Sequence, residues 1–170
     1  DAAVIRELGG QILLTTDLLI EGVHFDLTFT PLKHLGYKAA VLNFSDIAAM
    51  NGKPEQLVVS IAVSNRFTVE DIDEIYEGIK LACKNYKVDL VGGDTSASPQ
   101  GLFLSLSVIG RALEKDIVYR NGANVNDLIY VTGDLGAAYM GLLLLEREKQ
   151  DFVANPENQP ELSAHDYIDR

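Results

Sequence analysis

The residues best suited to chemistry are hydroxyl and carboxylate side chains that follow an apolar run. Thr15, Thr16 and Asp17 stand at the end of an expected strand, and a loop that carries His24 and further acids follows. Hard oxygen ligands of this kind are those that Mg²⁺ prefers in proteins. The alternative is a plain turn, in which Thr16 and Asp17 bond to local backbone and His24 packs with Phe25. Both interpretations remain open from these residues alone.

A second candidate, Asp46, lies in an expected helix over residues 33–50 that is rich in small side chains. An acid among apolar neighbours is costly to keep ionised unless a cation or several hydrogen-bond donors accompany it. A metal ion would explain Asp46; alternatively, Ser45 and Asp46 open a second helix as its N-cap. The helical spacing puts the following residues on one face: Ala39, Asn43, Asp46 and Met50.

A third candidate is the segment from Gly92 and Gly93 to Asp94, Thr95 and Ser96, placed directly after an expected strand. Two glycines let the backbone approach a bulky anion, and the following acid can hold the cation that accompanies a phosphate. A simple tight turn uses the same residues. The chain contains no Walker A pattern, which excludes a P-loop NTPase.

Arg120, in the turn from Tyr119 to Ala123, carries a planar guanidinium that suits phosphate oxygens. A surface arginine without a ligand is the alternative. The segment from Tyr130 to Gly136 resembles a dinucleotide-binding turn, but its glycine spacing differs from G-x-G-x-x-G, so we do not expect Rossmann binding.

Strands and amphipathic helices alternate along the chain, and this order predicts a two-layer α/β sandwich. The second helix is expected to start at Thr68, which forms a capping box with Asp71. A solvated connector is expected from Asp151 onward. The expected strands are Gln11–Thr16, Leu57–Val63, Val88–Val91, Leu102–Ile109 and Leu128–Thr132, and the third helix spans 137–149.

Composition excludes several classes of protein. The 170 residues include 14 Lys and Arg against 25 Asp and Glu, a formal net charge of −11, which argues against binding nucleic acid. No apolar run reaches the ~20 residues that span a bilayer, so we expect no membrane association. The single cysteine, Cys83, fits a reducing compartment, and we expect the cytoplasm. The chain begins with Asp1 rather than Met, and we expect it to be part of a longer protein.

Taken in order, these motifs resemble the thiamine-monophosphate kinase family. That family belongs to an ATP-binding superfamily that includes aminoimidazole ribonucleotide synthetase, selenophosphate synthetase and a hydrogenase maturation protein. The resemblance covers nearly the whole chain, and its most specific parts are the segment from Thr15 to Phe25 and the segment from Asn43 to Met50. It implies an α/β (α+β) two-layer sandwich like the N-terminal domain of aminoimidazole ribonucleotide synthetase. The implied sheet is mixed, has helices on one face and pairs with a second copy across a homodimer.

The resemblance also implies roles for individual residues. His24 matches a contact to the substrate, thiamine monophosphate, and no residue is implied as a general acid or base, since a phosphate acceptor that is already ionised scarcely needs one. Matches to the ATP site are Tyr76, Gly93, Asp94 and Arg120. Matches to positions that bind several Mg²⁺ ions, through side chain or backbone, are Asp1, Thr15, Thr16, Asp17, Asp46 and Asp94.

Departures from the family pattern are few. Asn51-Gly52 replaces a usual Gly-Ala, and Asn126 replaces a usual Gly; both changes are compatible with turns. The family's second half, with motifs that complete the active site, is not in this sequence, so we expect the chain alone to be inactive. We assign residues 1–133 to an N-terminal ATP- and Mg²⁺-binding domain and residues 134–170 to a helix and connector toward a second domain.

The reaction implied is transfer of the ATP γ-phosphoryl group to thiamine monophosphate, which gives thiamine diphosphate and ADP. Both reactants are anionic, so an acidic protein needs divalent cations to neutralise them and align the attack. Two alternatives remain: another ATP-dependent enzyme of the superfamily, and a non-catalytic dimerisation module that binds Mg·ATP without turnover.

Overall fold

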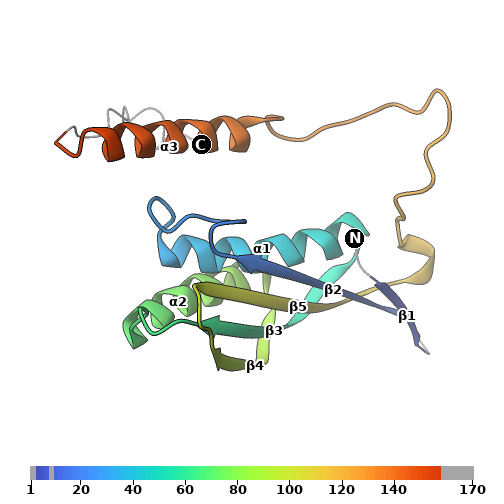
Figure 1. Ribbon diagram of the computed structural model, residues 1–170. Helices are drawn as coiled ribbons and strands as arrows, with labels where there is room; N and C mark the ends of the chain where they lie inside the picture. Colours follow the sequence, from blue (N-terminus) through green and yellow to red (C-terminus); the bar gives the residue numbers. More distant parts are fainter. Residues whose placement is uncertain (1–2, 8–9, 158–170) are drawn as a thin grey trace. The chain divides into compact units, whose positions relative to one another are not determined.

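The computed structural model describes residues 3–7 and 10–157 (Figure 1). By its internal contacts the chain divides into two compact units, Asp1–Ala123 and Asn124–Arg170, which are treated separately below. The elements of the first unit are β1 (Ala3–Glu7), β2 (Gly10–Ile20), α1 (Leu32–Ala49), β3 (Lys53–Val63), α2 (Val69–Tyr86), β4 (Asp89–Ala97), β5 (Leu102–Ala112) and the 3₁₀ turn η1 (Glu114–Asp116). The second unit contains α3 (Ala137–Ala154).

The strands form one five-stranded sheet in the order β1-β2-β5-β3-β4. Every neighbouring pair is antiparallel except β3 and β4, which run parallel. A parallel pair needs a crossover connection, and α2 supplies it between these two strands. The mixed sheet implied by the family resemblance is therefore confirmed.

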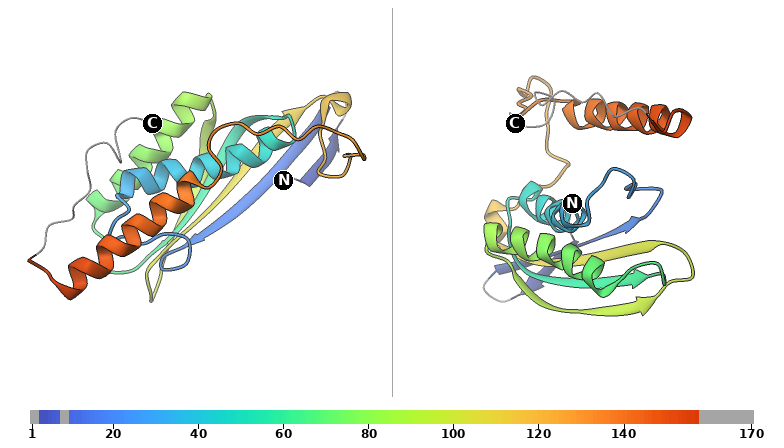
Figure 2. Two further views of the ribbon diagram at one scale, coloured as in Figure 1. Left: turned by 90° about the horizontal axis from the view of Figure 1, so that it is seen from above. Right: turned by 90° about the vertical axis from the view of Figure 1, so that its left-hand side faces the viewer.

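Both helices of this unit cover the same face of the sheet (Figure 2). α1 contacts β2, β5 and β3, whereas α2 contacts α1 and the edge strand β4. The sequence of β5 explains why one face is covered, because apolar residues alternate along this strand and point to that face. The fully buried residues under the helices are Leu102, Leu104, Leu106 and Val108. The two-layer sandwich with helices on one face is confirmed. The other face, named the open face, is covered by no helix of the first unit within its described residues.

The two helices approach each other through glycine. A Cβ on Gly36 of α1 would lie 2.0 Å from the carbonyl oxygen of Ile75, and one on Gly78 of α2 would lie 1.9 Å from that of Lys33. Backbone therefore contacts backbone where the helices cross. This close contact fixes α1 against α2, and α1 in turn contacts β2, the strand that carries the first candidate motif.

The expected helix boundaries are confirmed closely. The Thr68 hydroxyl accepts a hydrogen bond from the Asp71 amide, and the Asp71 carboxylate accepts one from the Thr68 amide, so the capping box is present. α1 ends one residue before the expected Met50. Asn51 (φ 57°) and Asn126 (φ 80°) both take the left-handed conformation, which glycine adopts freely and asparagine tolerates. These are the two positions at which the resemblance implies a glycine.

The strands are longer than expected, and two of the differences concern candidate residues. β2 continues through Asp17 to Ile20, because its pairing with β5 continues to Phe103. β4 continues to Ala97, so Gly92, Gly93 and Asp94 lie inside an edge strand instead of after one. Both motifs were wrongly assigned to strand ends.

The second unit differs more from expectation. The predicted strand Leu128–Thr132 is wrong: this segment is irregular, and its Ile129 is 94% exposed. It has β-forming residues but, in the part of the chain that the structure describes, no strand with which to pair. α3 extends to Ala154, beyond the expected end at residue 149, and takes in the start of the predicted connector. The rest of that connector lies outside the described residues after position 157.

The glycine contact between α1 and α2 gives a prediction about stability. Gly78→Ala should lower the free energy of unfolding by about 1–3 kcal/mol, because the added methyl group overlaps the Lys33 carbonyl. Gly141→Ala, also within a helix but with no atom within 4 Å of its Cβ, is the matched control. It should be neutral or slightly stabilising. Urea unfolding monitored by circular dichroism measures both, and equal behaviour of the two variants would refute the close contact.

Candidate functional site

The centre of the candidate site lies between β2 and α1, on the helix-covered face of the sheet. The Thr15 hydroxyl donates a 2.8 Å hydrogen bond to Oδ2 of Asp46. Thr15 is buried, and Asp46 is partly buried within α1. Asp46 stands three residues before the end of that helix, so the alternative that it caps a second helix is wrong.

Asp17 lies on the same strand as Thr15 and interacts electrostatically with Asp46. Partial burial raises the pKa of the Asp17 carboxyl above its ordinary value; the nearby Asp46 carboxylate raises it further, and His24 lowers it. A carboxyl whose charge is disfavoured by burial and by a neighbouring carboxylate is one that a cation would stabilise. Asp17, Asp46, Thr15 and His24 are thus brought within one region.

Thr16 lies on the opposite side of the sheet from Thr15. Its hydroxyl donates to the backbone oxygen of Leu106 at 3.1 Å and accepts a hydrogen bond from Ser107 at 2.9 Å. Because adjacent side chains of a strand point to opposite faces, the Thr16 hydroxyl faces away from Asp46. Only its backbone is placed to contribute to the site.

The loop after β2 holds His24 by its backbone and its ring. The His24 amide donates to the Ile20 carbonyl at 2.9 Å, and the imidazole Nδ1 accepts a hydrogen bond from the Ile20 amide at 3.0 Å. An Nδ1 that accepts leaves Nε2–H as the ring's donor. His24 is exposed and Phe25 is buried, so the alternative in which His24 packs away with Phe25 is not what the structure shows.

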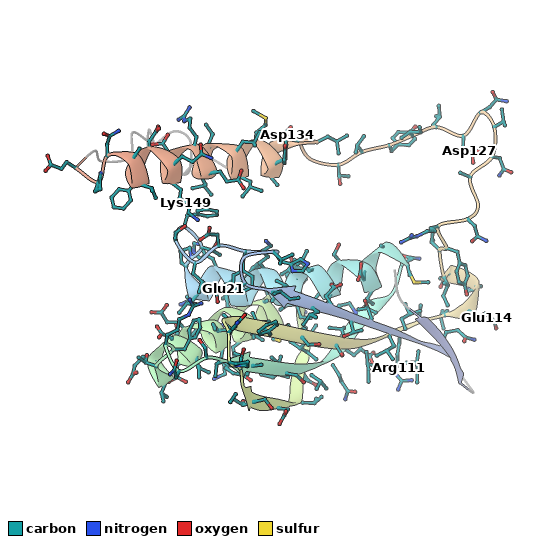
Figure 3. The ribbon with its side chains drawn as sticks, in the orientation of Figure 1. Glu21, Arg111, Glu114, Asp127, Asp134 and Lys149 are labelled. Atoms are coloured by element: carbon teal, nitrogen blue, oxygen red, sulfur yellow. The ribbon has the colours of Figure 1, made fainter. Side chains whose placement is uncertain are left out.

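Glu21 anchors this loop, a role that its place in the motif did not reveal. Its Oε2 accepts a 2.9 Å hydrogen bond from the Leu102 amide, and its Oε1 pairs with Arg66. The Arg66 guanidinium in turn lies 4.9 Å from the centre of the Phe67 ring. Figure 3 labels Glu21 at the end of the sheet opposite Arg111. Glu21 therefore joins the start of the His24 loop to β5 and to the loop before α2.

The structure does not bring Asp94 to this region within one chain. Asp94 lies on β4 opposite Ser60, with β5 and β3 between it and β2, about 14 Å away at the usual strand spacing. Packing alone explains a glycine at position 93, because a Cβ there would lie 2.0 Å from the Val59 carbonyl oxygen. Because Gly93 has no side chain, β4 can pair closely with β3 in the part of the ladder that follows the register shift at Leu57/Val58.

The remaining candidates have different surroundings. Tyr76 is partly buried against the hydrophobic core, which agrees with a packing role. Arg120 is exposed in an irregular segment at the end of the first unit. Asp1 lies outside the described residues.

The side chains of this region bear on whether the site fits Mg²⁺. The described residues contain no group of three or more His, Cys, Asp and Glu side chains arranged for a metal ion. Mg²⁺ commonly keeps several waters and binds one or two carboxylates together with substrate phosphates. Asp17 and Asp46, with the Thr15 hydroxyl beside them, fit that kind of site and do not form a closed protein cage.

Comparison with known proteins places the chain in a family. Residues 1–112 match the family model for the AIR synthase related protein, N-terminal domain. The chain belongs to this family. It is 39% identical to the thiamine-monophosphate kinase of Bacillus subtilis over 159 residues, which cover 93% of this chain and 47% of that protein. The chain thus spans about half the length of the curated relatives it matches.

Solved structures agree with this assignment. The crystal structure of thiamine monophosphate kinase from Aquifex aeolicus superposes with a TM-score of 0.80 at 34% identity and covers 94% of this chain and 51% of that one. The structure of AaThiL complexed with AMPPCP and TMP gives the same TM-score and identity, with coverage of 94% and 48%. No helix among the described residues is long and apolar enough to cross a membrane.

The carboxylate pair predicts a pH-dependent stability. Because the pKa of Asp17 is higher in the folded state than in the unfolded chain, folding takes up a proton, and stability falls as the pH rises through the interval between the two values. Asp17→Asn should therefore raise the thermal midpoint at pH 7 in EDTA, and the gain should disappear in acid.

Magnesium provides the second half of this test. At ten times its dissociation constant, Mg²⁺ should stabilise the unsubstituted protein by about 1.4 kcal/mol, and Asp17→Asn should lose most of this gain. Differential scanning fluorimetry measures both effects. A Mg²⁺ response that Asp17→Asn leaves intact would contradict the placement of the cation.

The anchoring role of Glu21 predicts a contrast between two ion pairs. Glu21→Ala should cost about 1–3 kcal/mol, since it leaves the Leu102 amide without its acceptor. Glu55→Ala is the control, because Glu55 and Arg111 form a more exposed pair that should be worth about 0–1 kcal/mol. Chemical denaturation compares them, and equal costs would show that Glu21 does not anchor the loop.

Proposed function

We propose that the full-length protein catalyses the ATP-dependent phosphorylation of thiamine monophosphate to thiamine diphosphate, with Mg²⁺ as cofactor. The observation that carries this proposal is that Asp17 interacts electrostatically with both His24 and Asp46. A residue suited to bind the substrate phosphate thus lies near a carboxylate suited to hold a cation. The relatives named thiamine-monophosphate kinase support the substrate. AMPPCP is an ATP analogue, and its presence with TMP in a related structure supports the two-substrate reaction.

The proposed roles of these residues follow from the charge of each side chain. Asp17 and Asp46 would hold Mg²⁺, which when bound neutralises phosphate charge and orders the oxygens for in-line transfer. The His24 imidazole, with Nε2–H as its donor, would bind the phosphate of thiamine monophosphate, because Nδ1 is already fixed to Ile20. This phosphate is itself the nucleophile and is ionised at neutral pH, so the site needs no general base.

Asp94, Gly93, Tyr76 and Arg120 remain proposed contacts to ATP. Asp94 and Gly93 lie on the edge strand, away from Asp17, so in this proposal the nucleotide bridges the two regions or a second chain completes the site. Asp1 remains a proposed metal ligand. We also keep the division into residues 1–133 and 134–170 as a proposal; the contact-based division falls ten residues earlier, at 123/124.

A homodimer is part of this proposal. The open face of the sheet carries exposed apolar residues, with hydroxyl side chains such as Thr16 and Ser107 between them. Exposed apolar area of this kind favours contact with another protein surface. The exposed apolar residues are Leu14 (37%), Leu18 (50%), Val58 (38%) and Val91 (53%). We propose a second copy of this chain as the partner and the cytoplasm as the compartment, which the buried, unpaired Cys83 supports.

The direct test incubates the full-length protein with Mg·ATP and thiamine monophosphate and follows thiamine diphosphate by mass spectrometry. We expect product, a loss of at least a hundredfold in Asp46→Asn, and no loss in Asp73→Asn, an exposed acid of α2. His24→Asn should lower kcat/KM for thiamine monophosphate roughly ten- to a hundredfold, as expected for a lost hydrogen bond to a charged group. His34→Asn, at an exposed position near the start of α1, is its control.

Two results would contradict the proposal. Binding of Mg·ATP without product would favour the non-catalytic module. Turnover of ATP that depends on a different acceptor would favour another enzyme of the superfamily.

A further inference from the structure

Asn43 is the most unusual buried residue near the candidate site. It lies within α1 with 0% of its surface exposed, and its Nδ2 donates a 3.2 Å hydrogen bond to the Ala39 carbonyl. Its Oδ1 has no hydrogen-bond partner among the described residues. The orientation of the amide is set, because exchanging the two atoms would place an oxygen against the Ala39 oxygen.

A buried acceptor without a partner is costly, because it has lost its hydrogen bonds to water without replacement. Asparagine is also a poorer helix former than leucine, so packing alone does not favour it at a fully buried helix position. A hydrogen bond to this oxygen from a bound group would remove that cost.

The position of Asn43 indicates which group its oxygen binds. Asn43 and Asp46 are three residues apart on one face of α1, where Cβ atoms lie about 5–6 Å apart. Asp46 accepts the Thr15 hydroxyl, and its charge acts on Asp17. The region therefore gathers an amide oxygen, two carboxylates and a hydroxyl whose proton is already donated. Such a set of acceptors needs a positive partner or the protons of bound water.

We propose that Asn43 is a positioning residue of the cation site: its Oδ1 accepts a hydrogen bond from a water molecule bound to the cation that Asp17 and Asp46 share. This inference rests on the cation of the proposed function but not on the identity of the phosphate acceptor. It accounts for a polar side chain at a position that is otherwise enclosed by the core.

The test measures Mg²⁺ binding without nucleotide or activity. Thermal unfolding of the full-length protein is titrated with Mg²⁺ alone for the unsubstituted protein, Asn43→Leu and Gln11→Leu. Gln11 is the matched control: it is 6% exposed, its Oε1 also lacks a partner, and it lies four residues before Thr15 on β2, about 13 Å away.

Without Mg²⁺, Asn43→Leu should be at least as stable as the unsubstituted protein, because the unpaired oxygen is removed. With Mg²⁺, the concentration that gives half of the stabilisation should rise five- to tenfold in Asn43→Leu and stay unchanged in Gln11→Leu. A purely structural role of Asn43 would change stability equally with and without Mg²⁺.

An unchanged Mg²⁺ midpoint in Asn43→Leu, or an equal shift in Gln11→Leu, would overturn the inference while leaving the cation site intact. No response of the unsubstituted protein to Mg²⁺ would instead remove the cation site itself, and this inference with it. Should Asn43→Leu not fold, Asn43→Asp carries the test: it should lower stability without Mg²⁺ and lower the Mg²⁺ midpoint, and an unchanged midpoint would overturn the proposal.

Discussion

The repulsion between Asp17 and Asp46 is the constraint on which the account depends. Asp17 comes from a strand and Asp46 from a helix. The Thr15 hydroxyl holds Asp46 beside this strand, and the pKa of Asp17 is raised first by burial and then by the Asp46 carboxylate. A cation would offset the cost of charging Asp17, and in the proposed function that cation is the Mg²⁺ that accompanies the phosphates.

The rest of the first unit keeps this pair in place. Gly36 and Gly78 allow backbone contact between α1 and α2, and the buried side chains of β5 seat α1 over β2. Glu21 then ties the loop after β2 to the neighbouring strand, which limits where His24 can lie relative to Asp17. For the proposed phosphoryl transfer, rigidity in these elements matters because that reaction depends on positioning more than on acid–base chemistry.

Much of this arrangement could be predicted from local sequence. The capping box at Thr68 and Asp71 marked the start of α2, and the glycine-compatible turns at Asn51 and Asn126 were anticipated. The strand ends could not be predicted, because the extension of β2 past Asp17 depends on its pairing with β5, about ninety residues later. For the same reason the apolar segment Leu128–Thr132 was mistaken for a strand: residue preference cannot supply a partner strand.

In the candidate site, too, residue types could be predicted from the sequence, whereas their arrangement in space could not. The residue types of Asp17 and Asp46 indicated cation chemistry, and helical spacing put Asn43 on the Asp46 face. Which face of the sheet each residue uses was not evident, because Thr15 and Thr16 are chemically alike and only the alternation of β2 separates them. The distance between Asp94 and Asp17 likewise follows from the strand order, in which β5 enters between β2 and β3.

The most direct test of the central claim is an anomalous-difference map from crystals of the full-length protein soaked with Mn²⁺, a substitute for Mg²⁺. The account predicts a peak between the carboxylates of Asp17 and Asp46, on the helix-covered face of β2. A map with no peak there, or with peaks only beside Asp94 on β4, would contradict it.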